Sequence, residues 1–456
     1  MNSTAANSNK KLVLLAASLI TFICCTDFSI VFTIIPAIQR DLGANMNQSQ
    51  WLMVGFTLTA AAFFITLGRF ADLIGHRKLL FLGVIGFAVS SLLAGLARSP
   101  SLLVTMRLLQ GIFVAAALPA SMAIISDTFP IKERGRALGI FNSATGIGLA
   151  AGPTIGSLVI YYLTWRWVFF LNIPIAAIAL VVGLVSIKES KISKVAVDWL
   201  GTVLLTITIG AILYVISQVS YYGWHGLVMW ALLIFFVSLI LLVIVECKVK
   251  QQVIPFKLFL NKGFILGAML FSATVGFAWS VMMIMPIYLH KQLGFSIEAS
   301  GLLIFVMTLM TIIAPIVAGH WFDKKNKVVA MHVTFLLSFL GLLLFAMLQS
   351  YGPMWLLIAG FIIFGFAWGA GNGISIPFAL AEAGADENAG VIGGGLVCTL
   401  YIVAVFTLTI FMAIFHHSSA NLPFAMRMHH GFYFLMVCLL FFWLFSTVKA
   451  SATVSK

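Results

Sequence analysis

The turn that decides the fold joins two apolar stretches, residues 50–70 and 79–97, and reads Gly68-Arg69-Phe70-Ala71-Asp72-Leu73-Ile74-Gly75-His76-Arg77-Lys78. Its glycines permit a tight turn and a close approach of two helices. The turn is polar, because Asp72 is flanked by Arg69, Arg77 and Lys78. About 20 apolar helical residues span the hydrocarbon core of a bilayer. The pattern therefore predicts two membrane-spanning helices joined at the bilayer surface.

The composition of the whole chain is that of a membrane protein. Of its 456 residues, 62% are hydrophobic and 9% are charged, and the mean hydropathy is +1.12. Soluble globular proteins carry about 25% charged residues. The formal net charge is +13, but the basic residues lie in short loops between apolar stretches. This distribution excludes a soluble enzyme, a disordered chain and a nucleic-acid-binding protein.

Fourteen apolar stretches are long enough to cross a bilayer as helices. They are 12–38, 50–70, 79–97, 101–125, 137–161, 166–187, 199–219, 227–246, 263–289, 300–320, 328–348, 354–379, 390–414 and 431–449. With both termini inside, 20 of the 26 Lys and Arg residues fall on the inner side and five on the outer side, while Arg107 lies within a stretch. Because cytoplasmic loops are enriched in Lys and Arg, this bias predicts an even number of helices and two cytoplasmic termini.

The chain also repeats itself at an offset of about 250 residues. The end of the first stretch, 34–43, has a counterpart at 284–294, and Gly68–Asp72 has a counterpart in Gly319–Asp323. Two six-helix halves with two helices inserted between them explain both echoes, and such repeats are common in secondary transporters. We expect an all-α polytopic membrane protein. Its N-terminal half would be 1–190, its inserted helices and linkers 191–262, and its C-terminal half 263–456.

Four further motifs lie in the N-terminal half. They are Asp27-Phe28-Ser29-Ile30-Val31-Phe32-Thr33-Ile34-Ile35-Pro36, Arg107-Leu108-Leu109-Gln110-Gly111, the spaced set Gly148, Gly152, Pro153 and Gly156, and Trp165-Arg166-Trp167-Val168-Phe169-Phe170-Leu171-Asn172-Ile173-Pro174. Together with the turn at 68–78, this ordered set resembles the major facilitator superfamily, and within it the fourteen-span drug:proton antiporters (QacA/EmrB-like multidrug efflux transporters). Ser157 replaces the last glycine of the antiporter motif. The C-terminal half is matched mainly by its spans and the repeat.

Asp27 and Arg107 are the candidates for proton coupling. A carboxylate near the middle of a span costs on the order of 3 kcal/mol, so it usually faces a cavity or a partner. Burial disfavours its charged form and a nearby arginine favours it, so proton binding would depend on conformation. The resemblance implies that Asp27 is the coupling carboxylate. Two alternatives stay open: Asp27 makes a static bond between helices, or Arg107 extends outward to water.

The motif residues Gly68, Arg69, Asp72, Gly75 and Arg77 are candidates for gating. The resemblance implies that Asp72 meets the cytoplasmic end of a helix in the other half and holds the inner side shut. That helix would be the one that begins near Gly390, where a helix N-terminus attracts a carboxylate. Alternatively, Arg77 or Arg136 partners Asp72 locally. The set Gly148, Gly152, Pro153 and Gly156 is expected to serve as the antiporter motif or simply to allow close helix packing.

Candidate substrate contacts combine polar side chains with flexible Met and flat aromatic side chains, which suit varied apolar ligands. They are Gln110, Trp279, Met283, Phe366 and Asn372. The same aromatic and Met pattern is equally typical of a stripe that faces lipid.

The function expected from the resemblance is proton-coupled export of amphipathic drugs or toxic organic compounds across the bacterial inner membrane. A dedicated exporter of an endogenous metabolite, such as a siderophore or an organic acid, is the first alternative, and a membrane sensor or assembly protein is the second. The expected partners are a small-molecule substrate, protons and the lipid bilayer, and a periplasmic adaptor is left open. No cofactor and no metal site is expected, because no nucleotide-binding loop occurs and the five cysteines form no C-x-x-C pair.

Overall fold

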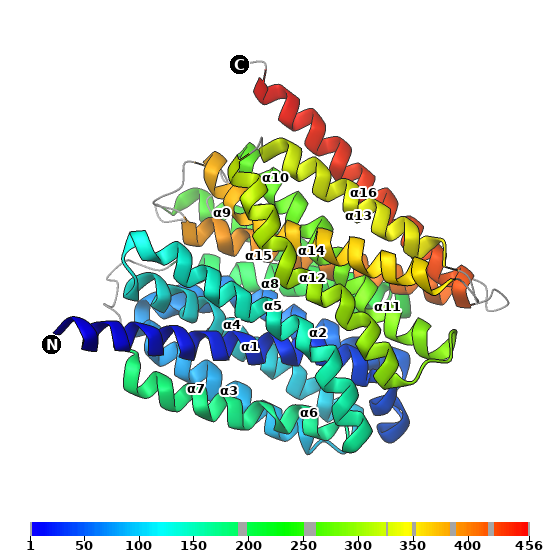
Figure 1. The fold of residues 1–456 in the computed structure, drawn as a ribbon, viewed down its shortest axis with the longest axis horizontal. Helices are drawn as coiled ribbons and strands as arrows, with labels where there is room; N and C mark the ends of the chain where they lie inside the picture. The colour runs from blue at the N-terminus through cyan, green and yellow to red at the C-terminus, as the bar shows by residue number, and fades with distance from the viewer. Residues whose placement is uncertain are drawn as a thin grey trace. The chain divides into compact units, whose positions relative to one another are not determined.

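The computed structural model describes residues 2–189, 198–249, 261–324, 327–348, 353–383, 389–417 and 424–454, and these residues form helices joined by turns (Figure 1). The helices are α1 Asn2–Leu42, α2 Met46–Ile74, α3 His76–Gly95, α4 Pro100–Thr128, α5 Ile131–Tyr162, α6 Arg166–Phe170, α7 Asn172–Ser186, α8 Trp199–Tyr222, α9 Leu227–Lys248, α10 Lys262–Phe271, the π-helix η2 Ser272–Gly276, α11 Phe277–Lys291, α12 Ile297–Lys324, α13 Lys327–Ala346, α14 Met354–Ala383, α15 Ala389–His417 and α16 Phe424–Val454.

Eleven helical segments within the described residues are long and apolar enough to cross a membrane. In two of them, consecutive elements form one segment: α6 with α7 over Arg166–Ser186, and α10, η2 and α11 over Lys262–Lys291. Shorter apolar helices lie at Ala299–Pro315 and Thr399–Phe415. The expected all-helical, multi-pass architecture is confirmed at this level.

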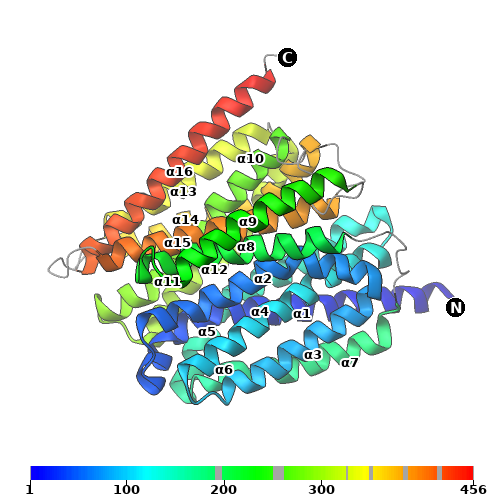
Figure 2. The ribbon, with the colours of Figure 1, turned by 180° about the vertical axis from the view of Figure 1, so that it is seen from behind.

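The first compact unit comprises residues 1–211 and 233–253. Within it, α1 packs along α5, α2 packs along α4, and α3 contacts both α4 and α7 (Figures 1 and 2). Helix α8 makes two polar contacts within this unit. The hydroxyls of Thr206 in α8 and Thr66 in α2 lie 2.6 Å apart, and those of Thr208 in α8 and Ser238 in α9 lie 2.9 Å apart. All the motifs of the N-terminal half lie between residues 27 and 174, so they all belong to this unit.

The second compact unit comprises residues 212–232 and 254–456. Here α12 and α13 pack on α14, and α15 packs on η2 and α11. The pairs α12 with α14 and α13 with α14 follow the order of α2 with α4 and α3 with α4, which is what the sequence echo between the halves predicts. The two units together divide residues 191–262 between them, within α8 and α9. The expected boundaries at 190 and 262 stay a prediction.

Local sequence explains where the helices that carry the motifs begin. Asn45 and Gln48 form a capping box at the start of α2, each accepting a hydrogen bond from the backbone N–H of the other. Ser99 caps α4 by accepting from the backbone N–H of Leu102, and Pro100 occupies the first turn, where its missing N–H is harmless. Ser99 and Pro100 thus fix the start of α4 about two turns before Arg107.

Candidate functional site

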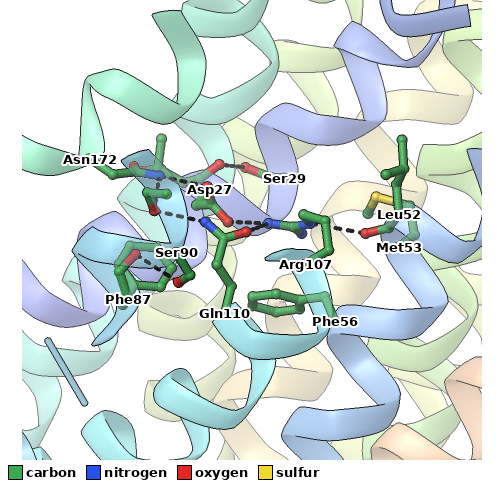
Figure 3. Close-up of polar contacts among 12 residues, drawn as sticks. Asp27, Ser29, Leu52, Met53, Phe56, Phe87, Ser90, Arg107, Gln110 and Asn172 are labelled. Atoms are coloured by element: carbon green, nitrogen blue, oxygen red, sulfur yellow. Dashed lines mark hydrogen bonds and ion pairs between the residues drawn. The ribbon is translucent and has the colours of Figure 1, made fainter. Parts of the chain in front are cut away.

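Asp27 lies within α1 and has only 1% of its surface exposed. Its carboxylate is held at both oxygens (Figure 3). Oδ2 accepts an ion-paired hydrogen bond from Nη1 of Arg107 in α4. Oδ1 accepts a hydrogen bond from Nδ2 of Asn172, the first residue of α7, at 2.6 Å. The structure thus brings together the two charged residues that the sequence analysis singled out, and it adds a third partner.

Arg107 is fully buried, and its guanidinium forms hydrogen bonds to residues of three helices, α1, α2 and α4. Nε donates to the backbone carbonyl oxygen of Leu52 in α2 at 3.0 Å, and Nη1 donates to Oε1 of Gln110 at 2.8 Å as well as to Asp27. The guanidinium carbon lies 4.3 Å from the ring centre of Phe56, a cation–π contact. Arg107 therefore does not extend outward to water in this structure.

Gln110 and Asn172 meet at Ser91 of α3. Gln110 Nε2 donates to the Ser91 hydroxyl oxygen at 2.7 Å, and Asn172 Nδ2 approaches the same oxygen at 3.3 Å. Asp27, Arg107, Gln110, Ser91 and Asn172 thereby close a ring of hydrogen bonds drawn from α1, α3, α4 and α7, which we call the Asp27 ring. All five residues have 5% or less of their surface exposed.

The charges of the Asp27 ring balance, because one carboxylate faces one guanidinium. A buried ion pair repays the loss of hydration only when its geometry is good and its remaining donors and acceptors are satisfied. Removing one partner leaves an uncompensated charge, at a cost of about 3–5 kcal/mol. The site therefore stabilises the state in which the charged Asp27 carboxylate is paired with the guanidinium of Arg107.

The glycines of the antiporter motif lie on α5 directly against the Asp27 segment of α1. A β-carbon added at Gly148 would lie 2.6 Å from the carbonyl oxygen of Phe22, and one added at Gly152 would lie 2.8 Å from the backbone nitrogen of Ile30. Gly156 is equally tight, at 2.8 Å from a side-chain carbon of Ile30. Three glycines one turn apart thus let α1 and α5 pack backbone to backbone.

Pro153 lies inside α5 beside these glycines, and the Ser157 hydroxyl donates to its carbonyl oxygen at 2.7 Å. Gly111, the last residue of the Arg107 motif, has the same packing role between α4 and α2, because an added β-carbon would overlap the carbonyl oxygen of Phe56. The glycines of both motifs therefore fix the helices that carry the Asp27 ring.

The turn expected over residues 68–78 is shorter in the structure: residues 68–74 are the end of α2, residues 76–78 begin α3, and Gly75 alone lies between the two helices. Gly75 has a φ of +101°, which ends α2, and its N–H donates to the carbonyl oxygen of Ala71 at 2.9 Å. Arg77 donates to the carbonyl oxygen of Leu184 at 3.1 Å, and its backbone N–H donates to Glu189 at 3.1 Å. Gly68 lies against Pro119, where an added β-carbon would have room at 3.7 Å.

The structure does not describe the side chains of Arg69, Asp72 and Arg136. It also does not describe those of residues 391–394, which follow Gly390. The gating contact expected of Asp72, and its local alternative with Arg136, therefore stay predictions.

A second polar cluster lies at the end of α1. Asp41 accepts a hydrogen bond from the Trp165 ring nitrogen at 2.9 Å and an ion-paired one from Nη1 of Arg166 at 2.6 Å. Arg166 also donates to the carbonyl oxygen of Ala97 at 3.2 Å and stacks on Trp165. This cluster ties the ends of α1, α3 and α6 together and gives the Trp165–Pro174 motif a structural role at its beginning.

The expected substrate contacts fall in different environments. Gln110 is fully buried in the Asp27 ring, and its two polar atoms are bonded to Arg107 and Ser91. Trp279 and Met283 of α11 are buried, with Trp279 against the ring of Tyr401, while Phe366 and Asn372 of α14 are half-buried.

Other aromatic residues of the same pattern form a core in the second unit. The ring of Phe345 in α13 lies 5.5 Å from that of Phe361 and 5.8 Å from that of Phe364. These aromatic residues of α14 therefore pack inside the unit, where Phe361 and Phe364 have no exposed surface.

Metal and thiol chemistry has little support in the described residues. Within them no group of three or more His, Cys, Asp or Glu side chains gathers as a metal site. Cys24 is buried, as expected of a small apolar residue, but Cys247 is exposed because it lies on the outer face of α9. The side chains of His416 and His417 lie outside the description, and His429 bonds to the carbonyl oxygen of Leu348.

Ser91 and Asn172 were not predicted as site residues from the sequence. Asn172 belongs to the Trp165–Pro174 motif, and the signal that could have indicated it is a lone amide at the start of an apolar helix. Ser91 carried no signal, because serines within helices commonly bond to their own backbone, as Ser90 does with the carbonyl oxygens of Gly86 and Phe87.

Comparison with known families settles the wider relationship. The family described as Major Facilitator Superfamily matches residues 17–406, which is most of the chain. The chain belongs to the major facilitator superfamily. The resemblance inferred from the motifs is thereby confirmed at the level of the superfamily, and with the apolar helices it identifies an integral, multi-pass membrane transporter.

Relatives of this chain include a protein named for multidrug resistance and one named for riboflavin transport. Multidrug resistance protein 3 of Bacillus subtilis (strain 168) is 27% identical over 385 residues, covering 84% of this chain and 74% of that protein. Riboflavin transporter RibZ of Clostridioides difficile (strain 630) is 28% identical over 401 residues, covering 86% and 85%. A POT family transporter in complex with 5-aminolevulinic acid has a TM-score of 0.71 at 16% identity over 96% of each chain, which shows a shared fold alone.

Proposed function

We propose that this transporter is a proton-coupled exporter of amphipathic drugs or toxic organic compounds across the bacterial cytoplasmic membrane, in the fourteen-span drug:proton antiporter branch. Its halves would be 1–190 and 263–456, with two inserted helices at 191–262 and both termini cytoplasmic. The observation that carries the proposal is the burial of Asp27 and Arg107 as a charge-balanced pair in the membrane-spanning part of the chain.

Protonation of Asp27 would change the charge of the Asp27 ring from zero to +1, because Arg107 stays protonated in proteins. An uncompensated buried cation is costly, so a rearrangement that hydrates or re-pairs Arg107 becomes favourable. Asp27 has almost no exposed surface in this state. Proton exchange therefore requires another conformation, and this requirement links the proton to the transport cycle without a cofactor.

Other motif residues fit supporting roles. The glycines at 148, 152 and 156 with Pro153 would let α1 and α5 move against each other, since α5 presents no side chain to α1 at the three glycine positions. Asp72 and its turn, with Gly68, Arg69, Gly75 and Arg77, would gate the cytoplasmic side. Trp279, Met283, Phe366 and Asn372 would contact substrate, whereas we assign Gln110 to holding Arg107.

A second candidate, a dedicated metabolite exporter, is favoured by one observation. A relative of comparable identity and coverage is named a riboflavin transporter. Expression in a strain that lacks its own exporters separates the two functions. Protection against several unrelated lipophilic cations supports multidrug export, and protection against none supports a single metabolite.

Asp27→Asn tests proton coupling. We expect it to abolish pH-gradient-driven efflux in inverted vesicles, whereas Asp41→Asn, a change of an exposed acid on the same helix, retains efflux. Because Asp27→Asn leaves the charge of Arg107 unpaired, the amount of folded protein is measured for each variant. Efflux by folded Asp27→Asn protein at the wild-type rate would remove Asp27 from the mechanism.

A further inference from the structure

The amide of Asn172 can both donate and accept hydrogen bonds, whereas the guanidinium of Arg107 can only donate them. We propose that Asn172 is a positioning residue for the coupling proton: its amide donates to the Asp27 carboxylate in the state described here and turns over to accept from the carboxylic acid once Asp27 is protonated. This inference rests on the proposed function, because it assigns a partner to the proton that Asp27 carries.

The two oxygens of Asp27 differ in what faces them. Oδ2 faces Nη1 of Arg107, and a guanidinium has five N–H donors and no acceptor. A proton added to Oδ2 would therefore point at another N–H. Oδ1 faces the amide of Asn172 at 2.6 Å, and an amide carries both an NH₂ donor and a carbonyl acceptor. A half-turn of this amide places its oxygen opposite the new O–H, so Oδ1 is the oxygen at which the acid form can be satisfied.

Ser91 can supply a second partner for the amide oxygen once the amide has turned. Its hydroxyl oxygen now accepts from Nε2 of Gln110 and, more weakly, from Nδ2 of Asn172. A hydroxyl is also a donor, and its hydrogen rotates to suit its surroundings. After the amide turns, the Ser91 O–H can donate to the Asn172 oxygen while it still accepts from Gln110. Buried polar groups are costly when unpaired, so this adaptability stabilises the acid form.

The charged and titratable groups near Asp27 among the described residues are few. Arg107 faces it from α4, and the thiols of Cys24 and Cys25 lie on its own helix. The neighbouring faces of α3, α5 and α7 present Ser91, the backbone of Gly148 and Asn172, none of which titrates. Arg107 and the amide of Asn172 hydrogen-bond directly to the Asp27 carboxylate, so they set the balance between its two forms.

The test measures the carboxylic-acid carbonyl band by infrared difference spectroscopy of purified protein in lipid vesicles, as a function of pH. Asp27→Asn identifies the band of Asp27. Asn172→Leu is close in size but has no polar atom. It removes a charge-assisted bond from the carboxylate and an ordinary one from the acid, and the former is about twice as strong. We expect the midpoint of the titration to move to higher pH by about one unit.

Ser91→Ala and Ser90→Ala form a matched pair. Ser91→Ala removes the donor that supports the turned amide, so we expect the midpoint to move to lower pH by about half a unit, opposite to Asn172→Leu. Ser90 bonds to its own helix, so Ser90→Ala leaves the midpoint unchanged.

The outcomes separate the inference from the function on which it rests. An unchanged midpoint in folded Asn172→Leu, or an upward shift in Ser91→Ala, overturns the amide turn while Asp27 keeps its role. If Asn172→Leu does not fold, the direction of the shift in Ser91→Ala decides alone. If no band at any pH depends on Asp27, proton binding at Asp27 fails, and the inference fails with it.

Discussion

Replacing Arg107 with methionine should destabilise the protein strongly, because it leaves the Asp27 carboxylate buried and without its cation. Arg107 has no exposed surface and donates to Asp27, Gln110 and the carbonyl oxygen of Leu52. Breaking such a buried pair at one end costs about 3–5 kcal/mol. At about 2–4 °C per kcal/mol for a domain of this size, the Tm should fall by roughly 10 °C.

The double variant Asp27→Asn/Arg107→Met isolates the charge from the packing. It removes both charges, so most of the lost stability should return, because neutral replacements of buried ion pairs are often tolerated. Thermal unfolding followed by fluorescence in lipid or detergent measures the three proteins side by side. Arg98→Met, a change of an exposed arginine, is the control and should alter stability by less than about 0.5 kcal/mol. A double variant no more stable than Arg107→Met would refute the reasoning.

Two further substitutions test the glycines. Gly152→Ala should lower stability by about 1–3 kcal/mol and slow efflux, because its β-carbon would lie 2.8 Å from the backbone of Ile30; Gly210→Ala on α8, with nothing within 4 Å, should be neutral or stabilising in the same thermal assay. Gly75→Ala should cost about 1–3 kcal/mol, because φ is +101° there. An unshifted Tm in Gly75→Ala would mean that the turn relaxes to another conformation.

Hydropathy and charge predicted the features for which a bilayer permits a single arrangement: the membrane-spanning helices and the pairing of lone charges inside them. Long apolar stretches must be helical in a bilayer, so the segments around α1, α4 and α9 could be placed from sequence. Asp27 and Arg107 could be paired in advance because each is a lone charge in an apolar helix and needs a partner.

Neutral polar residues were harder to interpret. Ser90 and Ser91 are adjacent and chemically identical, yet one bonds to its own helix and the other joins the Asp27 ring. Gln110 was predicted as a substrate contact, and in this structure its side chain bonds to Arg107 and Ser91. The direction in which such a side chain points depends on how the helices pack. Similarly, Phe361 and Phe364 could not be assigned to core or lipid, because both surroundings are apolar.

The contact between α1 and α5 has a mechanical consequence. Gly148, Gly152 and Gly156 present a smooth strip of backbone to the part of α1 that carries Asp27. Displacing two helices whose side chains interdigitate requires many rotamers to change together, whereas a smooth strip offers few such obstacles. A slide or a roll of α1 along this strip would therefore require little repacking on the α5 side.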